Sequence, residues 1–388
     1  MRLVVYTDSV FSEEAGVVYE MQSFSLFLGA LADEIEGMTI VARLDPQAGA
    51  TRYPLPRSVR FVALPHYSTM TRAAAVMSSL ARSLYRFWRA LDDADCVWLM
   101  GPYPHAVAFA AIAALRRRRV VLGVRQDFPT YVRHRRPRRR WMHLAADLLE
   151  QTWRVIARRC DVVAVGPELA RRYSGAKRVL EISVSLVSAQ DIAEGERALV
   201  ERSYDGELRV LSVGRLDEEK NPLLLADVLA NLRDGDSRWR LVVCGEGTLE
   251  GALAQRLEQR GLADAADLSG YVQLDQGLME LYRSSHALLH VSWTEGVPQV
   301  LSEAFAARLP VVATAVGGVA EAVGEAALLI APGDPSAAAD ALRRIADDQW
   351  LRAQLVNAGV ERVRSRTLES EAARVAAFIR GRTGSRTR

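Results

Sequence analysis

Residues 291–314 read VSWTEGVPQVLSEAFAARLPVVAT. This order predicts the end of a strand, a tight turn at Gly296, a short helix opened by Pro298 and a further strand from Pro310. The first amides of a helix have no intrahelical partner, and the helix dipole favours an anion such as phosphate there. Glu295 precedes the turn and Glu303 lies inside the helix. We therefore expect one carboxylate on each side of an anion site.

The pattern around these two carboxylates is more specific than their spacing, because acidic pairs at this spacing are common on solvated helix faces. The pattern Glu-Gly-x-Pro-x-x-x-x-Glu-Ala-x-Ala is followed by LPVVAT and then by VGG at residues 316–318. This order resembles glycosyltransferase family 4, whose members are retaining sugar transferases. The resemblance implies that Glu295 lies near the donor sugar hydroxyls and that Glu303 accepts hydrogen bonds from the ribose diol. It also implies donor contacts by Gly296, Val297 and Pro298.

The fold implied by the resemblance is an α/β fold of the GT-B type, with two Rossmann-like domains whose parallel sheets face each other across a cleft. A chain of 388 residues is long enough for two such domains. Residues 1–190 carry 27 Lys and Arg against 17 Asp and Glu, whereas residues 191–388 carry 23 against 30. We therefore predict an acceptor domain over residues 1–190 and a nucleotide-sugar domain over 191–365, with residues 184–207 as the linker. Residues 366–388 are predicted to form a helix that returns to the first domain, followed by a flexible tail.

A second motif follows the strand predicted over residues 208–213. Residues 214–222 read GRLDEEKNP and place Arg215 and Lys220 on one loop, where two cations can hold a diphosphate. They would neutralise the charge that grows on a leaving nucleoside diphosphate, and since this motif contains no Asp-x-Asp to support a metal site, no metal or other cofactor is expected. Taken alone, the two cations would be read as solvated loop charges. By the resemblance, turns after two later strands also line the nucleotide, through Gly245, Glu246, Tyr271 and Val272.

The first half alternates predicted strands and helices, which indicates a parallel sheet covered on both faces. The strand predicted over residues 3–6 leads into a loop over 7–16 and then a helix over 17–32. Such a loop is where open parallel sheets bind ligands, and the resemblance implies that glycine there lets backbone amides approach the donor phosphate or the acceptor. Gly16 is therefore a predicted donor contact, with an ordinary surface turn as the alternative.

The acceptor side departs from the family pattern. Family members commonly carry a His after the strand that matches residues 120–124, where this chain has Arg125, Gln126 and Asp127. Arg125 can hold a phosphate or carboxylate, and Asp127 is the nearest group able to take a proton from an acceptor hydroxyl. Together with Tyr103 and His105, which follow another strand end, these residues are the predicted acceptor site. The alternatives are salt-bridged loop residues for Arg125 and Asp127, and a helix-start residue for His105.

The most basic parts of the chain are Arg116–Arg119 and Arg133–Arg140, the second with aromatic residues interleaved. Such a segment resembles one that lies on an anionic membrane surface, and a solvated Arg-rich face is the equal alternative. Nucleic acid is not an expected partner, because no recognition motif accompanies the charge. Three unpaired cysteines and the absence of a signal peptide or a span of about 20 apolar residues predict a cytoplasmic protein, peripheral on the membrane if the basic surface binds lipid.

The resemblance that these motifs carry implies a retaining glycosyltransferase that moves a hexosyl unit from a UDP- or GDP-linked sugar to an acceptor hydroxyl. The acceptor implied is a lipid-linked or cell-surface glycan, or a small-molecule glycoside. Catalytic roles fall to Arg215, Lys220, Glu295 and Asp127. A nucleotide-sugar epimerase of the same fold, a pyridoxal-phosphate phosphorylase and a non-catalytic nucleotide-sugar-binding subunit remain alternatives.

Overall fold

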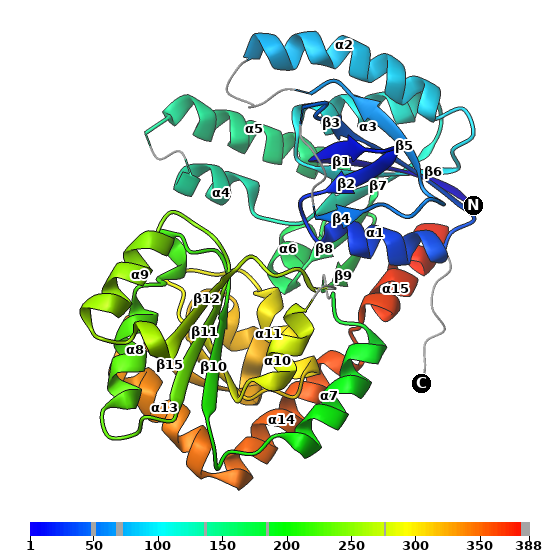
Figure 1. The fold of residues 1–388 in the computed structure, drawn as a ribbon. Helices are drawn as coiled ribbons and strands as arrows, with labels where there is room; N and C mark the ends of the chain where they lie inside the picture. Colours follow the sequence, from blue (N-terminus) through cyan, green and yellow to red (C-terminus); the bar gives the residue numbers. More distant parts are fainter. Residues whose placement is uncertain (48–51, 67–72, 136–137, 184–185, 275–276, 382–388) are drawn as a thin grey trace. The chain divides into compact units, whose positions relative to one another are not determined.

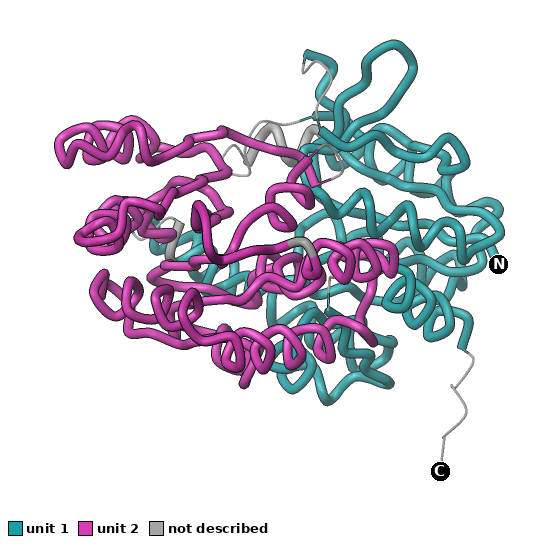
Figure 2. The backbone as a smooth tube through the Cα atoms, turned by 60° about the horizontal axis from the view of Figure 1, so that its bottom comes forward, with its two compact units in different colours: residues 1–184, 368–388 teal, residues 185–367 magenta. Residues whose placement is uncertain are grey.

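The computed structural model describes residues 1–47, 52–66, 73–135, 138–183, 186–274 and 277–381. They form two compact units, coloured separately in Figure 2: unit 1 contains residues 1–184 and 368–388, and unit 2 contains residues 185–367. The boundaries predicted from the sequence, after residues 190 and 365, lie within a few residues of these. None of the helices in the described ranges combines the length and the apolar character needed to cross a bilayer.

Unit 1 contains a nine-stranded sheet whose parallel part runs in the order β5-β3-β1-β6-β7-β8-β9 (Figure 1). The residues that face its two sides are mostly buried Val, Leu, Ile and Ala, as a sheet covered on both faces requires. The strands are β1 (Arg2–Glu14), β3 (Gly37–Leu44), β5 (Arg60–Leu64), β6 (Cys96–Gly101), β7 (Arg119–Val124), β8 (Asp161–Val165) and β9 (Arg178–Ile182).

Helices cover both faces of this sheet, each over its own apolar cluster. One cluster holds α1 (Phe24–Asp33) and α15 (Leu368–Arg380), so the C-terminal helix belongs to the core of unit 1. The other cluster holds α3 (Pro104–Leu115) and α5 (Arg140–Ala157), around the fully buried Trp153. The same side contains α2 (Ala73–Ala90) and α6 (Pro167–Arg172), while α4 (Phe128–Arg135) packs on α5.

The loop predicted over residues 7–16 and the helix predicted to begin at residue 17 are wrong. Strand β1 continues to Glu14, and its second half pairs antiparallel with β2 (Val17–Glu20), which in turn pairs with β4 (Tyr53–Pro54). Ala15 and Gly16 form the two-residue connection, with φ of 51° and 77°. Both values are positive, as tight hairpin turns need. Gly16 is therefore a hairpin residue of unit 1.

Unit 2 contains a six-stranded parallel sheet in the order β12-β11-β10-β13-β14-β15. Helices α8 (Leu224–Arg233), α9 (Glu250–Gln259) and α13 (Pro335–Asp347) contribute to one apolar cluster, and α10 (Leu278–Ser284), α11 (Gln299–Ala306) and α12 (Val319–Val323) to the other. Helix α14 (Gln349–Arg364) contributes to both. The strands are β10 (Leu208–Val213), β11 (Trp239–Cys244), β12 (Ala266–Gly270), β13 (Ala287–His290), β14 (Val311–Thr314) and β15 (Ala327–Ile330).

The linker predicted over residues 184–207 contains a helix instead, α7 (Ala189–Glu201). Ser188 and Asp191 form a capping box: the Ser188 hydroxyl accepts from the Asp191 amide at 3.0 Å, and the Asp191 carboxylate accepts from the Ser188 amide at 2.8 Å. This arrangement satisfies two amides that would otherwise lack a partner. Residues 184 and 185 of the predicted linker lie outside the described residues. The segment that follows them begins unit 2, because Val187 and Ile192 pack into its core.

Candidate functional site

A cavity of about 280 Å³ lies in unit 2 at the carboxyl ends of the central strands β10 and β13. The strand order reverses between these two strands, and open parallel sheets bind ligands at such a point. The first strand is followed by a loop and the short 3₁₀ helix η1 (Glu218–Lys220), and the second by residues 291–298. Charged and polar side chains from both segments line the cavity together: Arg215, Lys220, His290, Ser292, Glu295 and Gln299.

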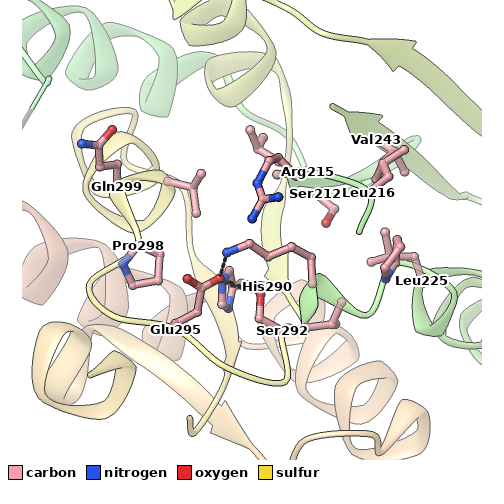
Figure 3. A pocket seen from close by; sticks show the side chains of 16 residues that line it. Ser212, Arg215, Leu216, Leu225, Val243, His290, Ser292, Glu295, Pro298 and Gln299 are labelled. Atoms are coloured by element: carbon pink, nitrogen blue, oxygen red, sulfur yellow. Dashed lines mark hydrogen bonds and ion pairs between the residues drawn. The ribbon is translucent and has the colours of Figure 1, made fainter. Parts of the chain in front are cut away.

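The Glu295 carboxylate is the centre of this cluster (Figure 3). Three donors converge on its Oε1 atom: Lys220 Nζ at 2.5 Å, Ser292 Oγ at 2.7 Å and His290 Nε2 at 3.0 Å. Burial alone would raise the pKa of Glu295, but the His290 hydrogen bond, the charge and hydrogen bond of Lys220 and the Ser292 hydrogen bond lower it to about 2. Glu295 is therefore an anion near neutral pH, and no described residue donates to its Oε2 atom.

Backbone contacts hold the two loops beside each other. The Trp293 amide donates to the Glu219 carbonyl at 2.9 Å, which links the loop of Glu295 to the helix η1 that carries Lys220. The Thr314 hydroxyl donates to the Ser292 carbonyl at 2.8 Å. Gly317 lies so close that a Cβ there would be 1.9 Å from the Glu295 carbonyl oxygen. A side chain at residue 317 would displace the Glu295 loop.

Arg215 lines the same cavity, and in Figure 3 its guanidinium points toward the side where Glu295 and His290 meet. The guanidinium forms ion pairs with Asp217 and Glu219 of its own loop, and its side chain is 59% exposed. Exposed ion pairs of this kind are worth about 0–1 kcal/mol each. A diphosphate can therefore replace these carboxylates at small cost.

Glu303 has a different environment, although the sequence pairs it with Glu295. It lies on α11, is buried, and does not line the cavity. Its Oε2 atom accepts a hydrogen bond from the Tyr282 hydroxyl at 2.8 Å. Burial raises the pKa of Glu303 to about 7, and the charge of Asp191 adds to this, while the Tyr282 hydrogen bond only partly opposes it. Its contact with a ribose stays a prediction.

Pro298 lines the cavity, but it caps α11 instead of occupying the first helical position as predicted. Its ψ of 127° is extended, so the helix begins at Gln299. Gly296 and Val297 belong to the same loop and, like the remaining predicted donor residues Gly245, Glu246, Tyr271 and Val272, they lie outside the cavity lining.

Gly245 and Glu246 make backbone contacts with the loop that carries Arg215. A Cβ on Gly245 would be 1.8 Å from the Gly214 carbonyl oxygen, so only glycine lets the two turns touch. The Glu246 carbonyl accepts from the Leu216 amide at 2.9 Å. Both contacts fix the loop that carries Arg215, and the nucleotide contacts of these residues stay predictions.

His290 and Ser292 are site residues that the sequence analysis missed. His290 lies at the end of a strand of apolar residues and is 6% exposed, so its sequence context is typical of a core residue. Both side chains hold Glu295 Oε1, and residues two apart at a strand end point to the same face. That spacing, directly before the acidic motif, is the signal that could have identified them.

Comparison with known protein families gives a match that lies within unit 2. Residues 198–362 match the family model "Glycosyl transferases group 1". The match includes Arg215, Lys220, Glu295 and Glu303, and it covers less than half of the chain.

Among curated relatives, the D-inositol 3-phosphate glycosyltransferase of Corynebacterium glutamicum is 32% identical over 178 residues, which are 44% of this chain and 42% of that protein. The chain thus spans less than half the length of the curated relatives it matches. The sucrose-phosphate synthase of Thermosynechococcus elongatus is 19% identical with a TM-score of 0.69, over 98% of each chain. The Anabaena protein Alr3699/HepE, solved in complex with UDP-glucose, is 16% identical with a TM-score of 0.68, over 99% of this chain and 100% of that one. The whole chain therefore has the GT-B fold.

The predicted acceptor residues belong to unit 1, where the structure gives Asp127 a structural role. Asp127 accepts hydrogen bonds from the amide of Thr130 at 3.2 Å and from its hydroxyl at 2.8 Å, and it pairs with Arg172 at 2.8 Å. Burial alone would raise the pKa of Asp127, but these contacts lower it below its ordinary value. A carboxylate with a lowered pKa is a weak base, so the structure favours the alternative of a salt-bridged loop residue.

Arg125 lies among buried groups at the end of β7. Its guanidinium is 3.9 Å from the centre of the Phe24 ring. Burial lowers the pKa of Arg125, although the charges of Tyr103 and Glu20 act in the opposite direction. Glu20 is fully buried, and burial raises its pKa to about 7. Tyr103 caps α3 with a pKa raised to about 12 by burial. The acceptor contacts of Arg125 and Tyr103 stay predictions.

The other two predicted acceptor residues are less informative. His105 is 1% exposed, its pKa is lowered by burial, and its ring centre lies 6.0 Å from that of Phe109. This environment favours a core role. Gln126 is half-buried in the turn between β7 and α4. Within the described residues, no three His, Cys, Asp or Glu side chains gather in a way that could hold a metal ion. Metal independence stays a prediction.

Proposed function

We propose that this protein is a glycosyltransferase that moves a hexosyl unit from a nucleoside-diphosphate sugar to an acceptor hydroxyl, with retention of the anomeric configuration. The observation that carries the proposal is the Lys220–Glu295 pair, 2.5 Å apart in a cavity at the switch point of unit 2. It lies inside the segment that matches group 1 glycosyl transferases. A cation and an ionised carboxylate side by side suit a substrate that carries a diphosphate next to sugar hydroxyls.

The charges of the cavity support one orientation of the donor. Lys220 and Arg215 supply the positive charge for the diphosphate, and the first amides of α11, at the edge of the cavity, add to it. Glu295 keeps Oε2 available, because its three donors all contact Oε1. As an anion it accepts hydrogen bonds from sugar hydroxyls through Oε2. Glu303 Oε2 is held by Tyr282, which leaves Oε1 for the ribose.

The proposed reaction replaces one C1–O bond by another. The bond between the anomeric carbon and the diphosphate oxygen breaks while the acceptor oxygen forms its bond to the same carbon on the same face. The acceptor proton passes to an oxygen of the departing phosphate. Lys220 and Arg215 stabilise the charge that develops on the nucleoside diphosphate, which is the largest contribution expected of a site of this kind. We expect no metal or other cofactor to be required.

The donor base and the acceptor are less constrained. We propose a UDP- or GDP-linked hexose, and the likeness to a protein solved with UDP-glucose favours UDP. The acceptor is a carbohydrate or lipid-linked hydroxyl, and the curated relatives include an amylovoran biosynthesis glycosyltransferase and an N-acetylgalactosaminyltransferase named for a PP-undecaprenol-linked glycan. A nucleotide-sugar epimerase would release an epimerised sugar without an acceptor, and a non-catalytic donor-binding subunit would bind the donor without ever releasing the nucleoside diphosphate.

A thermal-shift panel tests the donor site. UDP, GDP, ADP and their sugars are added with and without a chelator. A ligand at about 100 times its dissociation constant adds roughly 2.7 kcal/mol, which is about 5–10 °C for a unit of this size. We expect one diphosphate series to shift the protein regardless of chelator, and the Lys220→Ala variant to lose the shift. The absence of a shift with every nucleoside diphosphate would contradict the proposal. Release of an epimerised sugar without an acceptor would instead show an epimerase.

A further inference from the structure

Helix α5 (Arg140–Ala157) has two opposite apolar faces. Ala146, Glu150, Trp153 and Ala157 point into unit 1 and are buried. On the other side of the helix are large apolar side chains that stay exposed, which we call the α5 stripe: Trp141 (55% exposed), Leu144 (71%), Leu148 (66%) and Val155 (59%). Their spacing of three, four and seven residues aligns them along one side of a helix.

This arrangement is unusual for the outer face of a helix. A helix that covers a sheet normally presents charged and polar residues to water. Aligned exposed apolar residues mark a surface that meets an apolar partner. Helix α4 contacts a different side of α5, where Phe128 and Val132 pack with Met142, Ala146 and Leu149, so it leaves the stripe exposed (Figure 1).

Positive charge lies at both ends of the stripe. Arg138, Arg139 and Arg140 precede or begin α5, are exposed, and form no ion pair with any described residue. At the other end, a second cavity of about 380 Å³ is lined by Arg154, Arg158 and Arg172 together with Val155 of the stripe. Arginine is the side chain best suited to phosphate oxygens. The stripe is thus bordered by arginines, of which Arg172 is paired with Asp127 and Glu168.

The other basic segment, Arg116–Arg119, does not share this character. Arg116 pairs with Asp92 at 2.8 Å, and Arg118 donates to the Asp92 carbonyl at 2.9 Å. Arg119 pairs with Asp161 at 2.6 Å and donates to carbonyl oxygens of α15. These arginines hold unit 1 together, and the membrane surface predicted there is not supported. Residues 136 and 137 of the second basic segment lie outside the described residues.

We propose that the α5 face is a docking surface for a bilayer with anionic phospholipid headgroups. The stripe would lie at the level of the acyl chains, and the arginines at its two ends would bind headgroup phosphates. A second copy of this chain fits less well. Because both ends of the stripe are basic, parallel and antiparallel pairing would each bring arginines together. A nucleic acid would use the arginines and leave the stripe exposed. This proposal does not depend on the proposed sugar transfer.

Vesicle co-sedimentation of the full chain tests the proposal, with phosphatidylcholine vesicles that do or do not contain phosphatidylglycerol. Trp141 and Trp350 provide a matched pair, because each is the second residue of an α-helix and each is exposed. We expect binding to the anionic vesicles alone, weakened by 0.5 M NaCl. Trp141→Ser should lower the partition coefficient about fivefold and Leu144→Ser/Leu148→Ser at least about tenfold, while Trp350→Ser leaves it unchanged.

Several outcomes would overturn the proposal. One is no sedimentation with anionic vesicles, and another is equal loss in the Trp141 and Trp350 variants. Light scattering without lipid provides a third: a wild-type dimer that becomes a monomer in Leu144→Ser/Leu148→Ser would assign the face to a second copy. Vesicle binding that depends on Arg138–Arg140 but not on the stripe would show a purely electrostatic contact and would contradict the insertion of the stripe. Unchanged melting temperatures of the variants exclude misfolding as the cause.

Discussion

Glu295 and Glu303 lie in one short segment, and burial raises the pKa of both, yet the first has a pKa of about 2 and the second of about 7. The difference comes from their partners. Glu295 has a cation, an imidazole and a hydroxyl on one oxygen, whereas Glu303 has one neutral hydroxyl. A buried carboxylate is thus an anion or an acid according to the donors around it.

This difference separates two roles that the sequence motif does not distinguish. Glu295 remains charged across the working pH range and can only accept hydrogen bonds. Glu303 changes its protonation near neutral pH, so its hydrogen bonding to a ribose depends on pH. We therefore expect the affinity for a nucleoside diphosphate to vary between pH 6 and 8 through Glu303, and not through Glu295.

Of the changes that test the difference between Glu295 and Glu303, replacing Lys220 should have the largest effect on sugar transfer. Lys220→Ala removes the cation from both Glu295 and the diphosphate, so we expect kcat of transfer to fall at least about 100-fold. The pKa of Glu295 should also rise, since burial is then opposed by fewer donors. Nucleoside diphosphate release in the presence of donor and acceptor measures the rate.

The chain supplies its own control for this experiment, because its lysines are Lys177 and Lys220. Lys177 is exposed in unit 1, so Lys177→Ala should transfer sugar at the wild-type rate. If Lys220→Ala also keeps normal turnover, the cavity is not the donor site.

Glu303→Gln should have the next largest effect, on stability. The folded pKa of about 7 exceeds the ordinary value of 4.5, so the folded protein binds more protons than the unfolded chain between these pH values. The free energy of unfolding then falls as pH rises from about 4.5 to 7, by about 3 kcal/mol for a shift of this size. Glutamine has no charge to bury and should flatten this slope. Urea unfolding of unit 2 at pH 5, 6, 7 and 8 measures it.

Two comparisons sharpen this result. Glu20 is buried in unit 1 with a pKa of about 7, so Glu20→Gln should flatten a slope in the same direction for that unit. Among the described residues, Tyr282 is the one side chain that donates a hydrogen bond to Glu303, so Tyr282→Phe should raise the pKa of the Glu303 carboxyl further. Parallel wild-type and Glu303→Gln curves would mean that Glu303 is ionised in the folded protein.

Much of the fold could be predicted, because buried parallel strands are continuous apolar runs and their order follows from the alternation with helices. The errors came from local chemistry. The hairpin at Ala15 and Gly16 looked like a ligand loop, since β1 continues through mixed residues after Tyr6. Helix α7 was missed although Ser188 and Asp191 have the spacing of a capping box.

The candidate site was predictable where one loop carries the motif, and less so where two loops meet. Arg215, Lys220 and Glu295 stand out because charged residues follow strand ends. His290 does not stand out, because its role depends on the Trp293–Glu219 contact that brings the loops together. In the same way, Asp127 pairs with Arg172, which is 45 positions away in the sequence. The residues around Asp127 therefore do not predict this ion pair.

Replacing Asp127 should have the smallest effect of these variants, and its result decides whether Asp127 has a structural or a catalytic role. Like Glu295, it is a carboxylate whose pKa is lowered by a cation and hydrogen bonds, but its partners are a helix start and a half-buried arginine. Asp127→Asn keeps an oxygen for the Thr130 amide and loses the attraction of Arg172. We expect the free energy of unfolding to fall by about 1 kcal/mol or less, and the transfer rate to stay within about twofold. A 100-fold loss of kcat at unchanged stability would instead make Asp127 the base that accepts the acceptor proton, and the lowered pKa would then need a substrate-induced release of Arg172.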